Sequence, residues 1–252
     1  MALSPRELLD LIDKLWASQT PQAVLDTAAE HEADLIARSP QPEDAETCRQ
    51  VMLAAVRLGD LAEARVWRVR ATRRFAAVGW PAGTAAILMT ELYRALFEAN
   101  DGYPDGKTLD VLRPAPDAAR VLDELRPVAA GPASGFPFGP DPALIARFLH
   151  EKTGVVLMIE GDYAAAVSAF EAAIAFAAGE PRGKVKVELG KVLAEYLAAA
   201  PTGADAAQYA DRTDQLAAEA DAIGQNDIAE IARAKEAGMR AGSRGLSLYE
   251  ML

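Results

Sequence analysis

The 252-residue sequence is 51% hydrophobic and 25% charged, which supplies enough apolar material for a large core and excludes a disordered tail. Its formal net charge of −11 repels nucleic acid and anionic membranes, so we predict neither as a partner. The single cysteine, Cys48, cannot form an internal disulfide, which excludes a disulfide-stapled secreted domain.

The residue types indicate the kind of core. Aromatic residues are only 6% of the chain and alanine is abundant, which favours close helix–helix contacts over a thick β-sandwich core. We therefore predict an all-α fold. Residues 1–16 carry charges throughout, unlike a secretory signal, and no stretch approaches the roughly 18 consecutive apolar residues of a membrane span. A cytoplasmic protein is expected.

The N-terminal residues predict a helical hairpin. Ser4, Pro5 and Glu7 combine a cap, a first-turn proline and a capping acid, so a helix should begin near residue 5. Thr20-Pro21 opens a second helix to about residue 38, where a proline-rich stretch stops it. This hairpin resembles a divergent repeat or an end cap.

A third helix, about 43–58, ends at Leu58-Gly59-Asp60-Leu61, and the helix that follows is rich in arginine. Arg65, Arg68 and Arg73 lie roughly along one side of it, and further arginines at 70 and 74 lie along another. This basic patch would suit an anionic partner such as an acidic peptide or a phosphate group. Alternatively, it is a solvated helix that pairs with acids of neighbouring helices or with an acidic helix of another copy.

The middle of the chain is less regular. Trp80-Pro81 begins a long helix to about residue 99, residues 100–116 are expected to form a loop, and residues 117–126 form another helix. The glycine- and proline-rich segment 127–142 is predicted to be irregular, and such a long loop is either functional or mobile.

The stretch 147–181 predicts a second hairpin, which breaks at Glu160-Gly161-Asp162. In its second helix, apolar residues recur at intervals of three and four, as in a helix with one buried face. Gly154 and Ala166 place small residues where the two helices must come closest, and Phe170 provides a large side chain to fill the remaining gap.

The spacing of Gly154, Ala166, Phe170 and Ala173 resembles the tetratricopeptide repeat, although His150 stands where the family usually has tryptophan. The break at Gly161 lies 102 residues after the one at Gly59, which equals three repeats of about 34 residues. The resemblance implies an α-α superhelix of antiparallel helix pairs that binds protein segments on its concave surface.

The C-terminal part predicts helices over 181–200, 205–223 and 226–241, of which the second is strongly acidic, and a short tail at 242–252. We expect a single repeat domain over residues 1–241 with an irregular insert at about 100–142. Self-association through the acidic helix or the tail is a further expectation.

Motifs for chemistry are scarce, so we predict no metal, no cofactor and no enzymatic activity. The Gly102–Thr108 stretch ends like a phosphate-binding loop but has three residues between its glycines where four are needed. The two histidines, His31 and His150, and Cys48 lack partners at the spacing of a zinc or nucleophilic site. An enzyme with an unrecognised helical fold is the remaining alternative.

The predicted function is therefore a protein–protein interaction scaffold. If the resemblance holds, the first helix of each pair lines a groove for a partner segment. The groove residues are Arg49, Leu53, Arg57, Glu91, Arg94, Phe148, Glu151, Val155, Met158, Lys184 and Lys191. The later part is too apolar to stay exposed, so a partner, the 131–142 loop or the chain's own tail must cover it. A regulator that binds a peptide or small anion and changes partners is the alternative.

Overall fold

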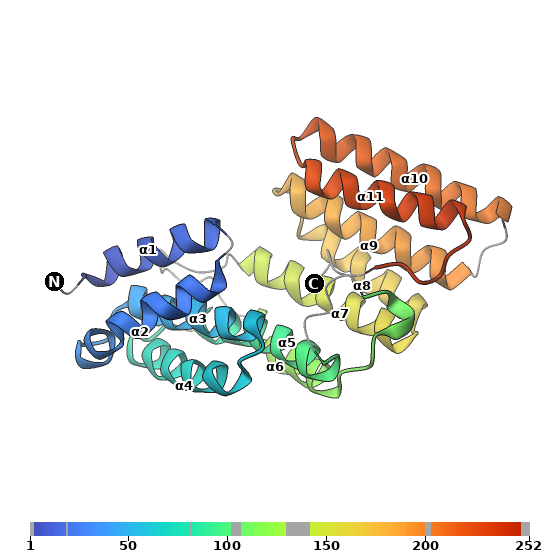
Figure 1. The fold of residues 1–252 in the computed structure, drawn as a ribbon. Helices are drawn as coiled ribbons and strands as arrows, with labels where there is room; N and C mark the ends of the chain where they lie inside the picture. The colour runs from blue at the N-terminus through green and yellow to red at the C-terminus, as the bar shows by residue number, and fades with distance from the viewer. Residues whose placement is uncertain are drawn as a thin grey trace. The chain divides into compact units, whose positions relative to one another are not determined.

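The computed structural model describes residues 3–18, 20–80, 82–101, 107–129, 142–199 and 203–247, and within these ranges it contains eleven α-helices and no strand. The helices are α1 (Pro5–Ala17), α2 (Pro21–Ala37), α3 (Pro42–Leu58), α4 (Leu61–Ala77), α5 (Ala82–Ala99), α6 (Pro116–Ala129), α7 (Pro142–Glu160), α8 (Tyr163–Ala175), α9 (Pro181–Ala199), α10 (Gly203–Ala222) and α11 (Asn226–Arg240) (Figure 1). A 3₁₀ turn, η1, covers Leu109–Val111. Consecutive helices pack against one another from α1 to α5 and from α8 to α11, which confirms the predicted all-α array.

The chain divides into two compact units. One consists of Met1–Tyr103 and Asp123–Pro142, and the other of Pro104–Leu122 and Ala143–Leu252. The N-terminal unit contains α1 to α5, the C-terminal unit contains η1 and the helices from α7 onward, and α6 contributes residues to both. The single repeat domain over residues 1–241 stays a prediction.

Two helix boundaries differ from the prediction. Helix α6 continues through Pro127 to residue 129 instead of ending at residue 126. Proline's fixed φ is compatible with a helix, and in the last turn it costs only one backbone donor. Helix α7 begins at Pro142, five residues before the predicted hairpin, with proline in its favoured first position. The rest of the expected irregular segment lies outside the described residues.

The two predicted glycine breaks share one geometry. Gly59 and Gly161 have φ angles of 77° and 85°, which an L side chain rarely adopts. The next residue, Asp60 or Asp162, donates its N–H to the carbonyl five residues back, at 2.9 Å in both cases. Each aspartate then caps the following helix through its own side chain. The 102-residue internal correspondence therefore extends to the hydrogen bonds of the turn.

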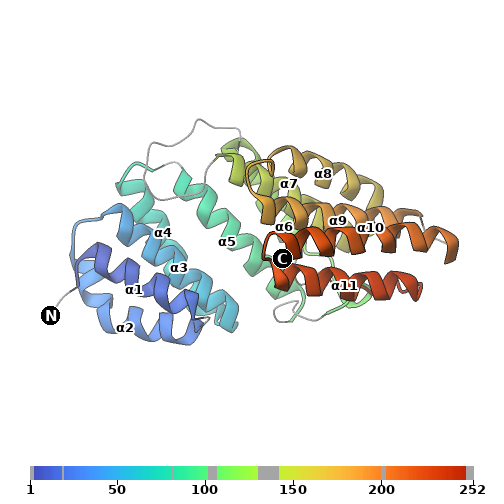
Figure 2. The ribbon, with the colours of Figure 1, turned by 90° about the horizontal axis from the view of Figure 1, so that it is seen from above.

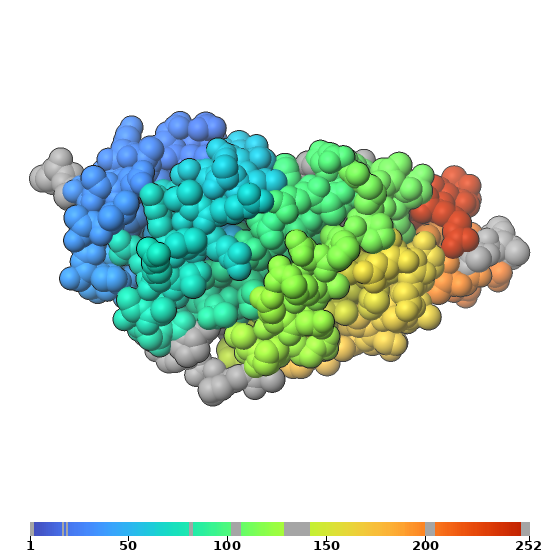
Figure 3. Space-filling view, turned by 90° about the horizontal axis from the view of Figure 1, so that it is seen from below, coloured from blue at the N-terminus to red at the C-terminus, as the bar shows by residue number. Residues whose placement is uncertain are grey.

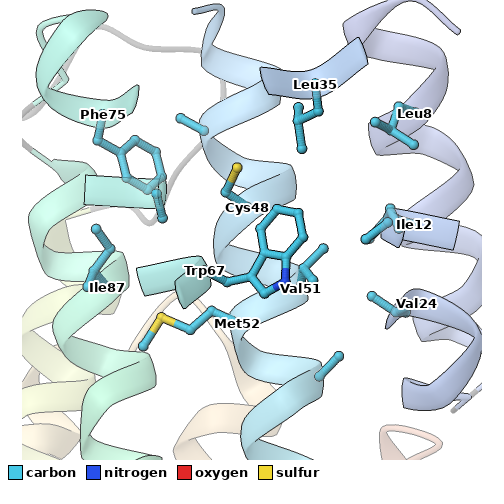
Figure 4. Packing of buried hydrophobic residues seen from close by; sticks show 14 of the residues in the cluster. Leu8, Ile12, Val24, Leu35, Cys48, Val51, Met52, Trp67, Phe75 and Ile87 are labelled. Atoms are coloured by element: carbon cyan, nitrogen blue, oxygen red, sulfur yellow. The ribbon is translucent and has the colours of Figure 1, made fainter. Parts of the chain in front are cut away.

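The core of the N-terminal unit lies between α1, α2, α3, α4 and α5. Figure 4 shows Trp67 of α4 beside Met52 of α3, with Leu8 and Ile12 of α1 on the far side of α3. The Trp67 indole N–H donates to Glu63, so the ring can be buried without an unsatisfied donor.

In the C-terminal unit, α9 packs against α8, α10 and α11, and Figure 2 shows α9, α10 and α11 side by side. The predicted close contact is present: a Cβ at Gly154 would lie 2.8 Å from two ring carbons of Phe170. The Phe170 ring is fully buried, as are Ala166 and Ala173. Glycine at 154 therefore provides the space that the ring occupies.

Residues 243–247 of the predicted tail pack onto the C-terminal unit. The Tyr196 hydroxyl donates to the carbonyl of Ser243 at 2.8 Å, and the ammonium of Lys235 donates to the carbonyl of Ser247 at 2.7 Å. Leu246 is buried above Gly238, where a Cβ would come within 2.5 Å of the leucine. Ser247 also forms an isolated β-bridge with Thr108. Residues 248–252 of the tail, which was one expected cover of the groove, lie outside the described residues.

Candidate partner-binding site

The groove residues predicted on α7 are buried. Phe148, Val155 and Met158 are at most 7% exposed, and Glu151 is 3% exposed. A partner that contacts these side chains would have to displace what covers them. The Gly131–Pro142 loop, which was one expected cover, is outside the described residues apart from its last residue.

Glu151 is the anion of a buried ion cluster. Its carboxylate lies 3.0 Å from the Lys152 ammonium, 3.4 Å from Lys186 and 3.5 Å from Arg147. Burial raises the pKa of Glu151, but the three cations together lower the pKa further, so the net shift is downward. The cluster therefore holds Glu151 ionised inside the protein.

The predicted groove residues of α3 and α9 lie nearer the surface. Arg57 is exposed and lies 5.0 Å above the Trp16 ring, and Arg49 is half-buried and paired with Glu46. Leu53 is half-buried. On α9, Lys184 is exposed and Lys191 is half-buried with Glu171 and Glu195 at 2.7 and 3.5 Å.

A charged network joins the remaining groove residues to the basic patch. The carboxylate of Glu91, which is 1% exposed, lies 3.1 Å from the Arg94 guanidinium and 3.4 Å from that of Arg68. Arg94 also pairs with Glu98, which in turn lies 3.1 Å from Arg65. These contacts correspond to the predicted pairing of the arginines with acids of a neighbouring helix.

The third predicted basic residue, Arg73, lies outside this network. Its side chain is exposed and has no hydrogen bond or ion pair with another residue in the described part of the chain. The structure therefore brings Arg65 and Arg68 together with α5 and leaves Arg73 on a different face of α4.

A pocket of about 490 Å³ opens beside Arg68 in the N-terminal unit. Its buried wall consists of Phe75, Trp80, Ile87 and Leu88, and its exposed lining includes Arg68, Thr72, Thr84 and Glu124. The pocket thus combines apolar and aromatic side chains with a few charged and hydroxyl groups, as binding pockets commonly do.

Local packing at the α4–α5 turn fixes the aromatic wall. The rings of Phe75 and Trp80 meet edge to face with centroids 4.8 Å apart, and the backbone N–H of Trp80 donates to the backbone carbonyl of Phe75. Gly83 leaves space for Phe75, since a Cβ there would lie 2.3 Å from the ring. The pocket was not foreseen from the sequence, although aromatic residues flanking Gly79 beside a small residue at 83 provide a signal for it.

Helix α3 buries two titratable residues, Asp44 and Cys48, whose pKa shifts were not predicted from the sequence. Burial raises the pKa of Asp44, an effect only partly offset by Arg38 and Arg74 at 3.6 and 3.8 Å. Burial also raises the pKa of the Cys48 thiol to about 12, which leaves it protonated and unreactive at neutral pH.

Among the described residues, no group of three or more histidine, cysteine or acidic side chains is arranged to hold a metal ion. None of the helices searched there combines the length and apolarity needed to cross a bilayer. No protein family, curated protein or solved structure matches the chain in comparisons with known proteins.

Proposed function

We propose that the protein is a non-enzymatic interaction scaffold that binds a segment of a partner protein at the α4–α5 pocket. The observation that carries the proposal is an apolar pocket with an arginine in its exposed lining. A bulky apolar side chain of the segment enters the pocket, and a neighbouring carboxylate pairs with Arg68.

The apolar wall supplies the affinity. Burying one large apolar side chain is worth roughly 1.5–3 kcal/mol, so one anchor gives a weak complex and further contacts along the segment strengthen it. The aromatic pair Phe75 and Trp80 is rigid, because each ring packs on the other and Phe75 packs on Gly83. A rigid wall loses little conformational entropy when a ligand binds.

Arg68 can exchange its ion-pair partner Glu91 for a carboxylate of the bound segment. Its side chain is 43% exposed and its contact with Glu91 is 3.4 Å, longer than the 3.1 Å contact between Glu91 and Arg94. Glu91 therefore keeps a cation when Arg68 turns toward a carboxylate of the ligand. This arrangement avoids leaving a buried, unpaired carboxylate, which would oppose binding.

The resemblance of residues 147–173 to the tetratricopeptide repeat supports the same class of function, because proteins of that family receive peptide segments. The site proposed here is narrower than the groove predicted from the sequence, since the predicted residues on α7 are buried.

The test is selection of peptides from a displayed random library against the full chain. We expect enrichment of sequences in which a bulky apolar residue lies close to Asp or Glu. Binding of the selected peptides should be lost in Thr84→Trp, which fills the pocket from its exposed lining, and should weaken in Arg68→Glu. Val111→Trp, on an exposed residue away from the pocket, is the matched control. Selected peptides that bind Thr84→Trp and the parent protein equally would refute the site.

A ligand-sensing regulator is the second candidate, because the pocket volume lies within the range of small-molecule sites. A small aromatic carboxylate such as 3-phenylpropionate would then raise the melting temperature of the parent protein but not that of Thr84→Trp. The shift should also disappear in Arg68→Glu, because Arg68 is the cation in the lining of the pocket. A melting temperature that stays constant over the titration would remove this candidate.

A further inference from the structure

The outward face of α4 carries apolar residues that no part of the pocket uses. Val66 and Val69 are 43% and 49% exposed, and they form a stripe along the helix with Ala62 and Arg73. Arg65 and Arg68 turn from this stripe toward α5, and Arg70 pairs with Glu32 on α2. Figure 3 shows the α4 region, in cyan to teal, on the viewed surface. We refer to Ala62, Val66, Val69 and Arg73 as the α4 stripe.

The α4 stripe differs from an ordinary solvated helix face in two ways. Its centre holds two β-branched residues, which have lower helix propensity than the charged residues usual at such positions. Its cation, Arg73, has no hydrogen bond or ion pair with any other residue that the structure describes. The stripe is therefore an apolar surface with an available positive charge.

The outward face of α10 has the complementary chemistry. Ala218 and Ala222 are exposed one turn apart, with Asp214 and Glu219 exposed on either side of them. Other acids of α10 are neutralised by α11, since Asp211 pairs with Arg240 and Asp221 pairs with Arg233. We refer to Asp214, Ala218, Glu219 and Ala222 as the α10 acidic face.

The carboxylates of Asp214 and Glu219 differ from those of Asp211 and Asp221, which pair with arginines of α11. Asp214 and Glu219 have no side-chain hydrogen bond or ion pair with the rest of the described chain. The face thus offers two available negative charges beside alanines small enough to admit a neighbouring helix closely.

We propose that the α4 stripe of one copy docks on the α10 acidic face of a second copy of this chain. Val66 and Val69 pack over Ala218 and Ala222, and Arg73 pairs with Asp214 or Glu219. The occupant is assigned from charge complementarity: one chain carries an arginine and two carboxylates that pair with no other described side chain, each beside exposed apolar or small side chains. This proposal does not depend on the α4–α5 pocket, because Arg68, Phe75 and Trp80 are not in the stripe.

The geometry of such a contact determines what assembles. The two docking faces are different surfaces, so the interface is heterologous and each added copy presents a further free face. The product is an open chain or a closed ring of copies, and its size increases with protein concentration. The net charge of −11 opposes this at long range, and at about 0.15 M salt the screening length of about 8 Å suppresses that repulsion more than the contacting pairs.

The test uses two complementary variants of the full chain, analysed by sedimentation velocity and light scattering at about 0.15 M salt. In the first, Val69→Asp with Arg73→Glu blocks the α4 stripe. In the second, Ala218→Trp with Ala222→Trp prevents close approach to the α10 acidic face but keeps its carboxylates, so the acidic stripe of the first variant meets no reversed charge there. We expect the parent protein to increase in mass with concentration and each variant alone to remain monomeric. A mixture of the two variants should form a heterodimer of one copy each, because only one productive interface remains.

A matched control separates the surface from the change in charge. Val111→Asp with Arg126→Glu makes the same chemical changes at exposed positions elsewhere, and this variant should associate like the parent protein. Circular dichroism of every variant checks folding, and all the substituted residues are exposed.

Three outcomes would overturn the proposal: a parent protein that stays monomeric over the whole concentration series, a stripe-blocked variant that still self-associates, or a mixture that yields no heterodimer. Peptide binding at the α4–α5 pocket should be unchanged in both blocked variants, so failure of the self-association proposal is distinguishable from failure of the proposed function.

Discussion

The α3–α4 and α7–α8 hairpins share a turn but not a core. Both turn at a left-handed glycine followed by a capping aspartate, and Ala64 and Ala71 correspond to Ala166 and Ala173, all fully buried. The pair that fills the second hairpin, Gly154 and Phe170, has no counterpart in the first, where the corresponding positions are Met52 and Arg68. The two hairpins thus have the same turn geometry, but different side chains fill the space between their helices.

The difference shows how a repeat position becomes available for another task. In the α3–α4 hairpin, Trp67, one residue before the corresponding position, fills the interior and is 1% exposed. Arg68 is then not needed in the core, and its side chain reaches the Glu91 network and the pocket. In the α7–α8 hairpin the same position is occupied by a core phenylalanine.

The largest expected effect is the difference between truncating Phe170 and truncating Arg68, which occupy corresponding positions in the two hairpins. Phe170→Ala should lower the free energy of unfolding by about 3–5 kcal/mol, because it removes a fully buried ring and leaves a cavity. Arg68→Ala should cost less than about 1 kcal/mol, because the side chain is 43% exposed and Glu91 keeps Arg94. Urea unfolding followed by circular dichroism measures both. Equal losses would show that the two positions do the same structural work.

Enlarging the small residue of the second hairpin should give the next largest effect. Gly154→Leu forces atoms into the space of the Phe170 ring and should cost roughly 1–3 kcal/mol. The control is Met52→Leu, a nearly volume-conserving change that places the same side chain at the corresponding position, which should cost less than about 1.5 kcal/mol. If thermal melts of Gly154→Leu and the parent protein coincide, the close contact is wrong.

Two buried carboxylates should give the hairpins opposite responses to pH. The pKa of Asp44 is raised, so its contribution to stability is complete below the ordinary aspartate pKa of about 3.9 and is lost as pH rises through the raised value. The pKa of Glu151 is lowered, so its contribution is complete above the ordinary glutamate pKa of about 4.3 and is lost as pH falls through the lowered value.

Unfolding by urea across the acidic pH range measures this contrast. The stability of the parent protein relative to Asp44→Asn should decrease as pH rises, and its stability relative to Glu151→Gln should increase. Glu160→Gln, at an exposed carboxylate, is the control that should show little dependence on pH. If the two stability differences changed with pH in the same direction, the opposite pKa shifts of Asp44 and Glu151 would be wrong.

The smallest effect is expected at Arg65. Its ion pair with Glu98 joins a side chain that is 67% exposed to one that is 29% exposed, so Arg65→Ala should change the free energy of unfolding by no more than about 1 kcal/mol. A loss as large as that of Phe170→Ala would mean that the outward arginines of the α3–α4 hairpin are structural.

Helix positions followed from local signals in the sequence, because prolines, caps and left-handed glycines act within a few residues. The Gly154–Phe170 contact followed from spacing, since one helix face must match the next. Burial of Glu151 and Glu91 did not follow, because hydrophobic periodicity assigns charged residues to solvent and the cations that compensate them come partly from other helices. The pocket was missed for a similar reason: its wall combines residues of two helices and the turn between them.

The alternation of the two units along the sequence has a consequence for synthesis. Residue 108 pairs with residue 247, so the early part of the C-terminal unit must wait, as the chain leaves the ribosome, until nearly the whole polypeptide has been made. A cut after residue 142 leaves the C-terminal unit without residues 104–122, and a cut after residue 103 leaves the N-terminal unit without residues 123–142, so no single cut gives two pieces that each hold a whole unit. Expression of two halves should recover native structure only when both are made together and reassociate.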